Sequence, residues 1–186
     1  YTLSIGGAGD ELANTLSSIS SGFLLSIVIV YLLLVTLFSS WMQPLIILLT
    51  IPLSVAGGLV GIHFAHAWSG GQASFDVIGM LGFIILAGIV VNNAILILHQ
   101  RNNFVAEGLD AASALEQASR SRLRPILMTV ITTVAGMLPL AIGGGAGAEL
   151  YQGLGAIITG GLVVSTLITL FLVPMVVSLL PDVKTT

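Results

Sequence analysis

The chain contains two long stretches without a single charged side chain. No Asp, Glu, Lys or Arg lies between Glu11 and Asp76, and none lies between Asp76 and Arg101. About 20 apolar residues cross the roughly 30 Å hydrocarbon core of a bilayer, so stretches of this length are typical of membrane spans. With 56% hydrophobic and 7% charged residues and a mean hydropathy of +1.10, the chain is predicted to be an integral membrane protein.

Five apolar segments are long enough to span a bilayer, and together they predict an all-α membrane fold. Between the third and fourth segments, apolar residues recur every three positions from Leu109 to Ala118. This spacing predicts a short amphipathic helix along the membrane surface. Pro125 suits the first position of the span that follows. The predicted spans are residues 16–38, 44–64, 77–99, 125–142 and 154–180, and the amphipathic helix is residues 103–121.

Positive charge is confined to one side of the predicted membrane. With five spans, the loop 101–124 and the tail 181–186 lie on the same side, and all five Lys and Arg residues fall in them. The opposite side, residues 1–15, 65–75 and 143–151, has none. The positive-inside rule therefore puts the arginine loop and the tail in the cytoplasm. Because the chain begins outside and without Met, we expect it to be a segment of a longer protein, starting at the end of a periplasmic domain.

The third span carries two adjacent carboxamides, Asn92 and Asn93. A polar pair at this depth requires hydrogen bonds from another helix or from water in a cavity. Neighbouring residues point about 100° apart on a helix, so the two amides are expected to face different neighbours. Gly88 lies one turn from Asn92, and Gly82 shares a face with Asn93. Small residues at such positions favour close helix packing.

The fourth and fifth spans each carry a polar stripe. On the fourth, one helical face is formed by Thr129, Thr132, Thr133 and Gly136. On the fifth, one face is formed by Gly161, Ser165 and Thr169. Asn92 and the threonines lie at similar depth, which predicts a polar seam between these helices that could serve a transport pathway. The alternative is that small and hydroxyl residues only hold the helices together, as is common in membrane proteins.

No motif for catalysis or cofactor binding is present. His63 and His66 lack further metal ligands, and the glycine-rich stretch 143–147 lacks the lysine of a phosphate-binding loop. There is no cysteine, and a net charge of -3 is too small to indicate a nucleic-acid partner. We therefore predict no enzyme activity, no cofactor, no metal and no nucleic acid.

Four segments carry a more specific signal. They are LFSSWMQPLIILLTIPLS (37–54), GIVVNNAIL (88–96), RLRPILMT (122–129) and LPLA (138–141). In order and spacing they resemble the inner-membrane efflux pumps of the resistance–nodulation–cell division (RND) superfamily, and most closely the acriflavine-resistance, hydrophobe/amphiphile type. The resemblance covers nearly the whole chain. It implies that the chain supplies the last five of twelve helices, after the end of a large periplasmic domain.

The resemblance also implies a function and partners. Pumps of this kind are homotrimers of the bacterial inner membrane that export small amphiphilic compounds such as drugs in exchange for protons. The implied partners are the lipid bilayer, the N-terminal repeat of the same transporter, a periplasmic adaptor and an outer-membrane channel.

The resemblance assigns roles to particular residues. By position, Thr129 matches a threonine of the proton-coupling cluster, and Arg122 matches an arginine near the cytoplasmic proton exit. Asn93 matches the motif's asparagine, but Asn92 occupies the position of a lysine that works with two membrane aspartates of the N-terminal repeat. Asparagine can hydrogen-bond but cannot form an ion pair, so a weaker response to aspartate protonation is expected. The predicted coupling cluster is Asn92, Asn93, Thr129, Thr132, Thr133 and Arg122.

Two alternatives remain open. The same fold could export another cargo, such as a metal or a lipid, although the methionines are scattered and the spans contain no Glu. The chain could also be a truncated membrane scaffold that transports nothing. In that case the polar stripes would contribute only to helix packing, because five helices without a partner repeat do not form an alternating pathway.

Overall fold

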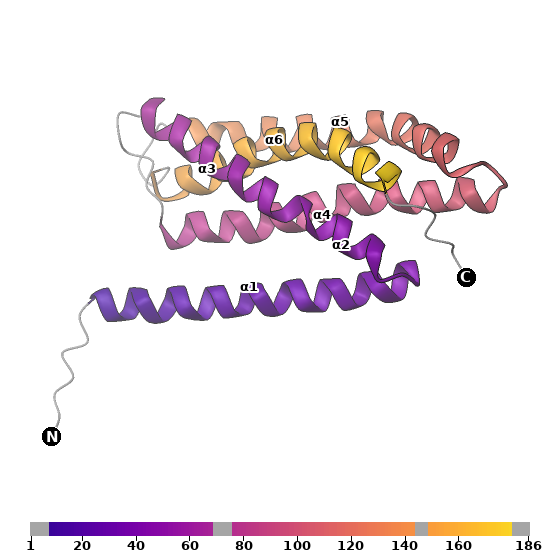
Figure 1. Ribbon diagram of the computed structural model, residues 1–186. Helices are drawn as coiled ribbons and strands as arrows, with labels where there is room; N and C mark the ends of the chain where they lie inside the picture. The colour runs from indigo at the N-terminus through magenta and orange to yellow at the C-terminus, as the bar shows by residue number, and fades with distance from the viewer. Residues whose placement is uncertain (1–7, 69–75, 144–148, 180–186) are drawn as a thin grey trace, which may run out of the picture.

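The computed structural model of the chain describes residues 8–68, 76–143 and 149–179, which form six helices (Figure 1). They are α1 (Ala8–Phe38), α2 (Met42–Leu48), α3 (Thr50–Trp68), α4 (Val77–Ala106), α5 (Ala111–Ile142) and α6 (Glu149–Leu179). Five helical segments of the described part are long and apolar enough to cross a membrane, and the second of them joins α2 and α3. The predicted all-α membrane fold with five spans is confirmed.

The ends of the chain differ from the predicted boundaries. Residues 8–15, predicted as the end of a periplasmic domain, form the first two turns of α1. The remainder of that prediction, residues 1–7, lies outside the described residues, as does the predicted tail 181–186.

The prediction of a separate surface helix over residues 103–121 is wrong. Helix α4 continues to Ala106, and α5 runs without interruption from Ala111 through Pro125. The chain turns between them at Gly108, which has a φ of +98°, and Asp110 caps α5 by accepting a hydrogen bond from the Ser113 backbone N–H. Pro125 removes only one backbone donor, a loss that packed membrane helices tolerate, so it does not begin a new helix.

Part of the apolar face predicted for that segment packs against protein. Ala114, Leu115 and Ala118 are buried in the first turns of α5. Leu115 lines one groove together with Pro174 and Met175 near the end of α6. Of the residues in the predicted three-residue spacing, Leu115 and Ala118 are buried, whereas Leu109 is half-buried and Ala112 is exposed, so the spacing identified the buried face only in part.

The second predicted span is divided into two helices. Helix α2 ends at Leu48, and α3 begins at Thr50. Pro52 gives the physical reason, because it has no N–H to donate to the carbonyl of Leu48 and its ring crowds that carbonyl. The chain bends there while remaining one apolar membrane span, Met42–Ala67.

Helices α3 to α6 form a bundle, and α1 lies beside it (Figure 1). Helix α6 packs against α3, α4 and α5. Its fully buried side chains Ile157 and Leu162 belong to the same hydrophobic core as Leu86 and Ile97 of α4. Helix α1 reaches the same core mainly near its C-terminal end, where Leu34 and Phe38 are buried in the described structure. Much of the rest of α1 is exposed.

The closest helix contact joins α3 to α6 through glycines. A Cβ atom built on Gly61 would lie 2.8 Å from the Cα of Gly160, and one built on Gly57 would lie 2.7 Å from the Cβ of Val164. Any larger side chain would have to push the two backbones apart. Small residues spaced four apart are a common means of close helix packing in membranes, and here they fix α3 onto α6.

Candidate functional site

The two adjacent asparagines of α4 have opposite surroundings. Asn93 is 6% exposed and lies inside the bundle, whereas Asn92 is exposed. Their neighbours Val91 and Ala94 are both buried, so Asn92 marks an edge of the exposed face of the helix. This arrangement agrees with the expectation that the two amides face different neighbours.

Asn92 lies in a groove between α1 and α4, which we call the α1–α4 groove. It has a volume of about 510 Å³ and is lined by Phe23, Ser26, Ile27, Val30, Leu33, Leu34, Leu37, Ile51, Ile84, Ala87, Gly88, Val91, Asn92 and Ile95. Apart from Asn92, its only polar side chain is Ser26, whose hydroxyl donates to the Phe23 carbonyl of its own helix at 2.8 Å. Within the described part of the chain, the Asn92 amide has no hydrogen-bond partner.

Gly88 leaves the groove open one turn from Asn92. A Cβ built on Gly88 would meet no atom within 4 Å, and the same holds for Gly136 of α5. Neither glycine packs against another helix among the described residues, so the packing role of these two glycines stays a prediction. Both lie on exposed faces, and such a face can receive a further helix at short distance.

The other two predicted packing glycines do lie at helix contacts. A Cβ on Gly82 of α4 would be 3.4 Å from the Ile157 side chain of α6, and Gly161 of α6 lies directly against Leu86 of α4. Ser165 and Thr169 of α6 are buried, and the Ser165 hydroxyl donates to the Leu162 carbonyl at 3.2 Å.

The threonine stripe of α5 faces outward. Thr129 and Thr132 are exposed, and Thr133 is half-buried. The Thr129 hydroxyl donates to the Ile126 carbonyl at 2.8 Å, and the Thr132 hydroxyl donates to the Met128 carbonyl at 2.7 Å. Both bonds stay within α5, so the described residues do not form the closed seam with α4 that the sequence predicted. What α4 and α5 share is exposed polar side chains, Asn92 on one and Thr129 on the other.

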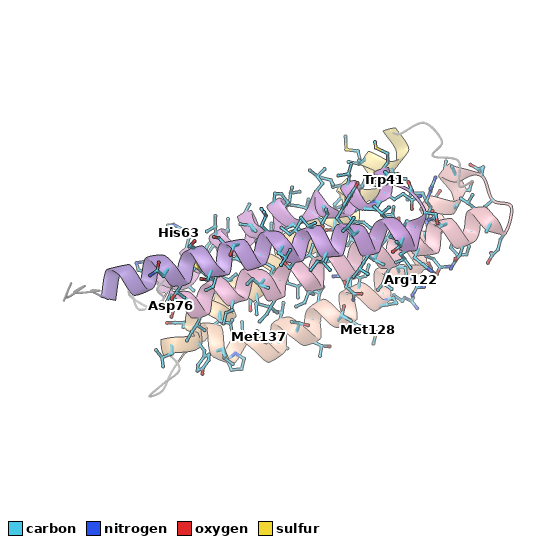
Figure 2. All side chains as sticks on the ribbon, turned by 90° about the horizontal axis from the view of Figure 1, so that it is seen from below. Trp41, His63, Asp76, Arg122, Met128 and Met137 are labelled. Atoms are coloured by element: carbon cyan, nitrogen blue, oxygen red, sulfur yellow. The ribbon has the colours of Figure 1, made fainter. Side chains whose placement is uncertain are left out.

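Arg122 joins α5 to α4 at one end of the bundle. Its Nη2 donates to the side-chain oxygen of Gln100 at 2.6 Å. Figure 2 places Arg122 and Trp41 toward one end of the helices, with Asp76 and His63 toward the other. Arg101, Arg120, Arg122 and Arg124 belong to this same end, which we call the arginine end.

Sequence reasoning missed the partner of Arg122 and a second polar cluster at the arginine end. Gln100 is one of several polar residues where α4 ends, and nothing in the pattern distinguishes it. Gln43 of α2 hydrogen-bonds Asn102 of α4, although 59 positions separate them in sequence. A glutamine followed by proline at the start of a span indicates a turn. The sequence pattern therefore does not predict that Gln43 lies at the end of α4.

The fold and these polar faces define a multi-pass helical membrane protein, and comparison with known proteins places it more closely. Residues 1–180 match the AcrB/AcrD/AcrF family. The chain belongs to this family of RND efflux transporters.

Individual relatives agree with this assignment. The swarming motility protein SwrC of Bacillus subtilis is 39% identical over 180 residues, which cover 96% of this chain and 16% of SwrC. The multidrug resistance protein MdtC of Erwinia tasmaniensis is 42% identical over 158 residues, which cover 82% of this chain and 14% of MdtC. The chain thus spans about one sixth of the relatives that it matches.

A solved structure shares the fold. A crystal structure of a heavy metal efflux pump superposes with a TM-score of 0.77 at 26% identity, covering 93% of this chain and 16% of that protein. A second crystal form gives a TM-score of 0.67 at 29% identity.

Proposed function

We propose that this chain is the C-terminal membrane segment of an inner-membrane transporter that uses the proton motive force to export hydrophobic and amphiphilic compounds such as drugs. The observation that carries the proposal is Asn92, an exposed amide without a partner in the described residues, in a groove that would otherwise lie open within the membrane. An amide in hydrocarbon requires a hydrogen-bond partner. The family supplies one in the N-terminal repeat, and relatives about six times longer have room for it.

The α1–α4 groove is the place where a helix of the N-terminal repeat would lie. Ala87 and Gly88 allow a second backbone to approach closely, and Ser26 and Asn92 offer hydrogen bonds from opposite walls. The groove opens onto α1, which touches the bundle mainly at one end, so a helix can enter without breaking the α3–α6 core. In transporters built from repeats, binding sites form between the repeats.

Asn92 would take part in proton coupling by hydrogen bonding. Its amide N–H groups donate to an ionised carboxylate, and its carbonyl oxygen accepts from a protonated carboxyl group. An asparagine therefore stays bonded in both protonation states but changes which atom it uses, and the geometry of the pair changes with it. This exchange involves less energy than breaking a lysine ion pair, so the coupling is weaker.

The remaining features complete the proposal. Thr129 and the exposed stripe of α5 would extend the polar contact with the N-terminal repeat, and Arg122, fixed by Gln100, would lie on the proton exit at the arginine end. The arginine end would be cytoplasmic, as the positive-inside rule requires. Family membership supports a homotrimer that works with a periplasmic adaptor and an outer-membrane channel.

The experiment uses the full-length transporter, with each variant checked for its amount in the membrane. We expect Asn92→Ala and Thr129→Ala to reduce drug resistance and proton-coupled dye export, whereas Asn92→Lys retains both. Asn103→Ala, at the exposed end of α4, is the matched control and should behave like the wild type. If Asn92→Ala and Thr129→Ala both leave export unchanged, Asn92 and Thr129 have no role in coupling.

A second cargo is favoured by one observation, the fold shared with a heavy metal efflux pump at a TM-score of 0.77. The shared portion is the membrane segment alone, which covers 16% of that pump. A susceptibility panel of detergents, dyes and metal salts separates the two cargoes. If the transporter gives resistance to metal salts alone, its cargo is a metal ion and not an amphiphilic compound.

A further inference from the structure

A buried polar cluster at the arginine end joins α2 to α4. Gln43 is 2% exposed and Arg101 is 8% exposed, and both contact Asn102. The Asn102 amide nitrogen donates to the Gln43 side-chain oxygen at 2.9 Å, and an Arg101 Nη1 donates to the Asn102 side-chain oxygen at 3.3 Å.

These bonds occupy the side-chain oxygens of Gln43 and Asn102 and leave two donor groups of the cluster without an acceptor. Arginine can only donate, so the Asn102 oxygen must face Arg101, and its nitrogen must then face the oxygen of Gln43. The unused groups are the Nε–H of Arg101 and the side-chain NH₂ of Gln43. Both nitrogens are shielded from solvent and have no acceptor among the described residues. Buried polar groups of this kind normally have a partner.

The cluster also carries a positive charge for which the described residues supply no counter-ion. A guanidinium group stays protonated in proteins, so Arg101 cannot lose its charge on burial. Among the described residues, the ion pair between charged side chains is Arg120 with Glu116, both of them exposed. A buried charge is strongly destabilising when nothing compensates it. The two free donors and the charge call for the same ligand, an anion with several acceptor oxygens.

The position of the cluster indicates the source of that anion. Trp41, two residues before Gln43, is 67% exposed, and its ring lies 6.3 Å from that of Tyr31. Exposed Met42 and Leu45 flank the same turn. Aromatic rings beside exposed apolar side chains are typical of the level where lipid headgroups meet hydrocarbon. Basic pockets between membrane helices at this level are suited to anionic headgroups.

We propose that Arg101 and Gln43 form a binding site for the phosphodiester headgroup of an anionic lipid, such as phosphatidylglycerol, in the leaflet at the arginine end. A phosphodiester presents only acceptor oxygens and one negative charge, which matches the two leftover donors and the uncompensated guanidinium. Zwitterionic lipids bring their own cation and neutralise Arg101 less well. Because both nitrogens are shielded, binding requires these side chains to turn outward toward the headgroup.

The test compares melting temperatures of the full-length transporter in nanodiscs of phosphatidylcholine with and without phosphatidylglycerol. We expect phosphatidylglycerol to raise the Tm of the wild type and of Arg124→Gln, an exposed arginine at the same end. Arg101→Gln should lose this response. In native mass spectrometry it should retain phosphatidylglycerol about tenfold less well, as expected for losing one charge-assisted hydrogen bond.

A second variant keeps the test decisive if Arg101→Gln folds poorly. Gln43→Glu places a carboxylate in the polar cluster that contains Arg101, so it should raise the Tm in phosphatidylcholine and remove the response to phosphatidylglycerol. The proposal is overturned if Arg101→Gln or Gln43→Glu keeps the full response. It is also overturned if inorganic phosphate raises the Tm as phosphatidylglycerol does. A third contrary outcome is that Asp182→Asn lowers the Tm in phosphatidylcholine and that this loss does not add to the loss caused by Arg101→Gln. That result would identify a protein carboxylate as the counter-ion.

Discussion

Arg122 Nη2 and the side-chain oxygen of Gln100 lie 2.6 Å apart and connect α5 to α4 at the arginine end. The two helices diverge from a short turn between residues 106 and 111, and this bond lies about two turns away from it along α4 and about three turns away along α5. Gln100 therefore determines where the guanidinium of Arg122 is held. A residue that acts through Arg122 in this way is a positioning residue.

Removing this bond should loosen α4 from α5. For Gln100→Ala we expect a loss of about 1.5–3 kcal/mol in the free energy of unfolding, the usual range for a hydrogen bond to a charged group. The check is a double-mutant cycle with Arg122→Ala, in which the two losses should not add because both remove one interaction. Additive losses would mean that the bond does not form in the membrane.

Enlarging the glycines between α3 and α6 should destabilise the bundle. Gly61→Ala places a Cβ 2.8 Å from the Gly160 Cα, and we expect a loss of about 1–3 kcal/mol from overpacking. Gly22→Ala in α1 is the matched control, since a Cβ there meets no atom within 4 Å. It should be neutral or slightly stabilising, because Ala is the better helix former. Thermal unfolding in detergent measures both, and equal Tm values would contradict the close contact.

Filling the α1–α4 groove should spare the fold of the five spans and impair the whole transporter. Gly88→Leu adds a side chain where the described residues leave open space, so the segment itself has nothing to displace. A helix of the N-terminal repeat, if it lies there, would be pushed away. We expect normal expression with reduced export for Gly88→Leu, and normal export for Gly22→Leu on α1. Full export by Gly88→Leu would exclude a helix from the groove.

The N-terminal cap of α5 should respond to acid. Hydrogen bonds from the side chain and backbone N–H of Ser113 lower the pKa of Asp110 below its ordinary value. A lowered pKa in the folded state means that the cap stabilises α5 above the unfolded pKa and that this contribution is lost as pH falls through the folded value. Hydrogen exchange of the first turn of α5 should therefore lose protection at acidic pH. Asp110→Asn keeps a good capping residue without the titration, so its protection should not change over this range.

The number of spans was predictable from sequence because hydrocarbon leaves few choices. A stretch without charge from residue 12 to 75 can hide its backbone polar groups only by forming helices. The positions of Gly82 and Gly161 at helix contacts followed from the same small-residue rule.

The continuity of α5 and the surroundings of individual polar residues were not predictable. Pro125 is compatible with a helix start and with a helix interior. It lies in the interior of α5, where buried residues such as Ala118 and Ile126 occur both before and after it. Hydropathy places Asn92 and Asn93 at one depth but cannot say which of them meets the core. The partners of Arg122 and Arg101 depended on where α2 and α5 meet the end of α4, which only tertiary structure provides.

The opposed surroundings of Asn92 and Asn93 restrict how α4 can move. A turn of the helix about its own axis by one residue, about 100°, would carry Asn93 to the exposed position of Asn92 and the fully buried Leu86 to the exposed position of Ile85. Such a rotation would exchange one exposed amide for another while breaking the core. Any signal that passes along α4 between the groove and the arginine end must therefore travel as tilt or as sliding along the helix axis, with its rotational setting locked.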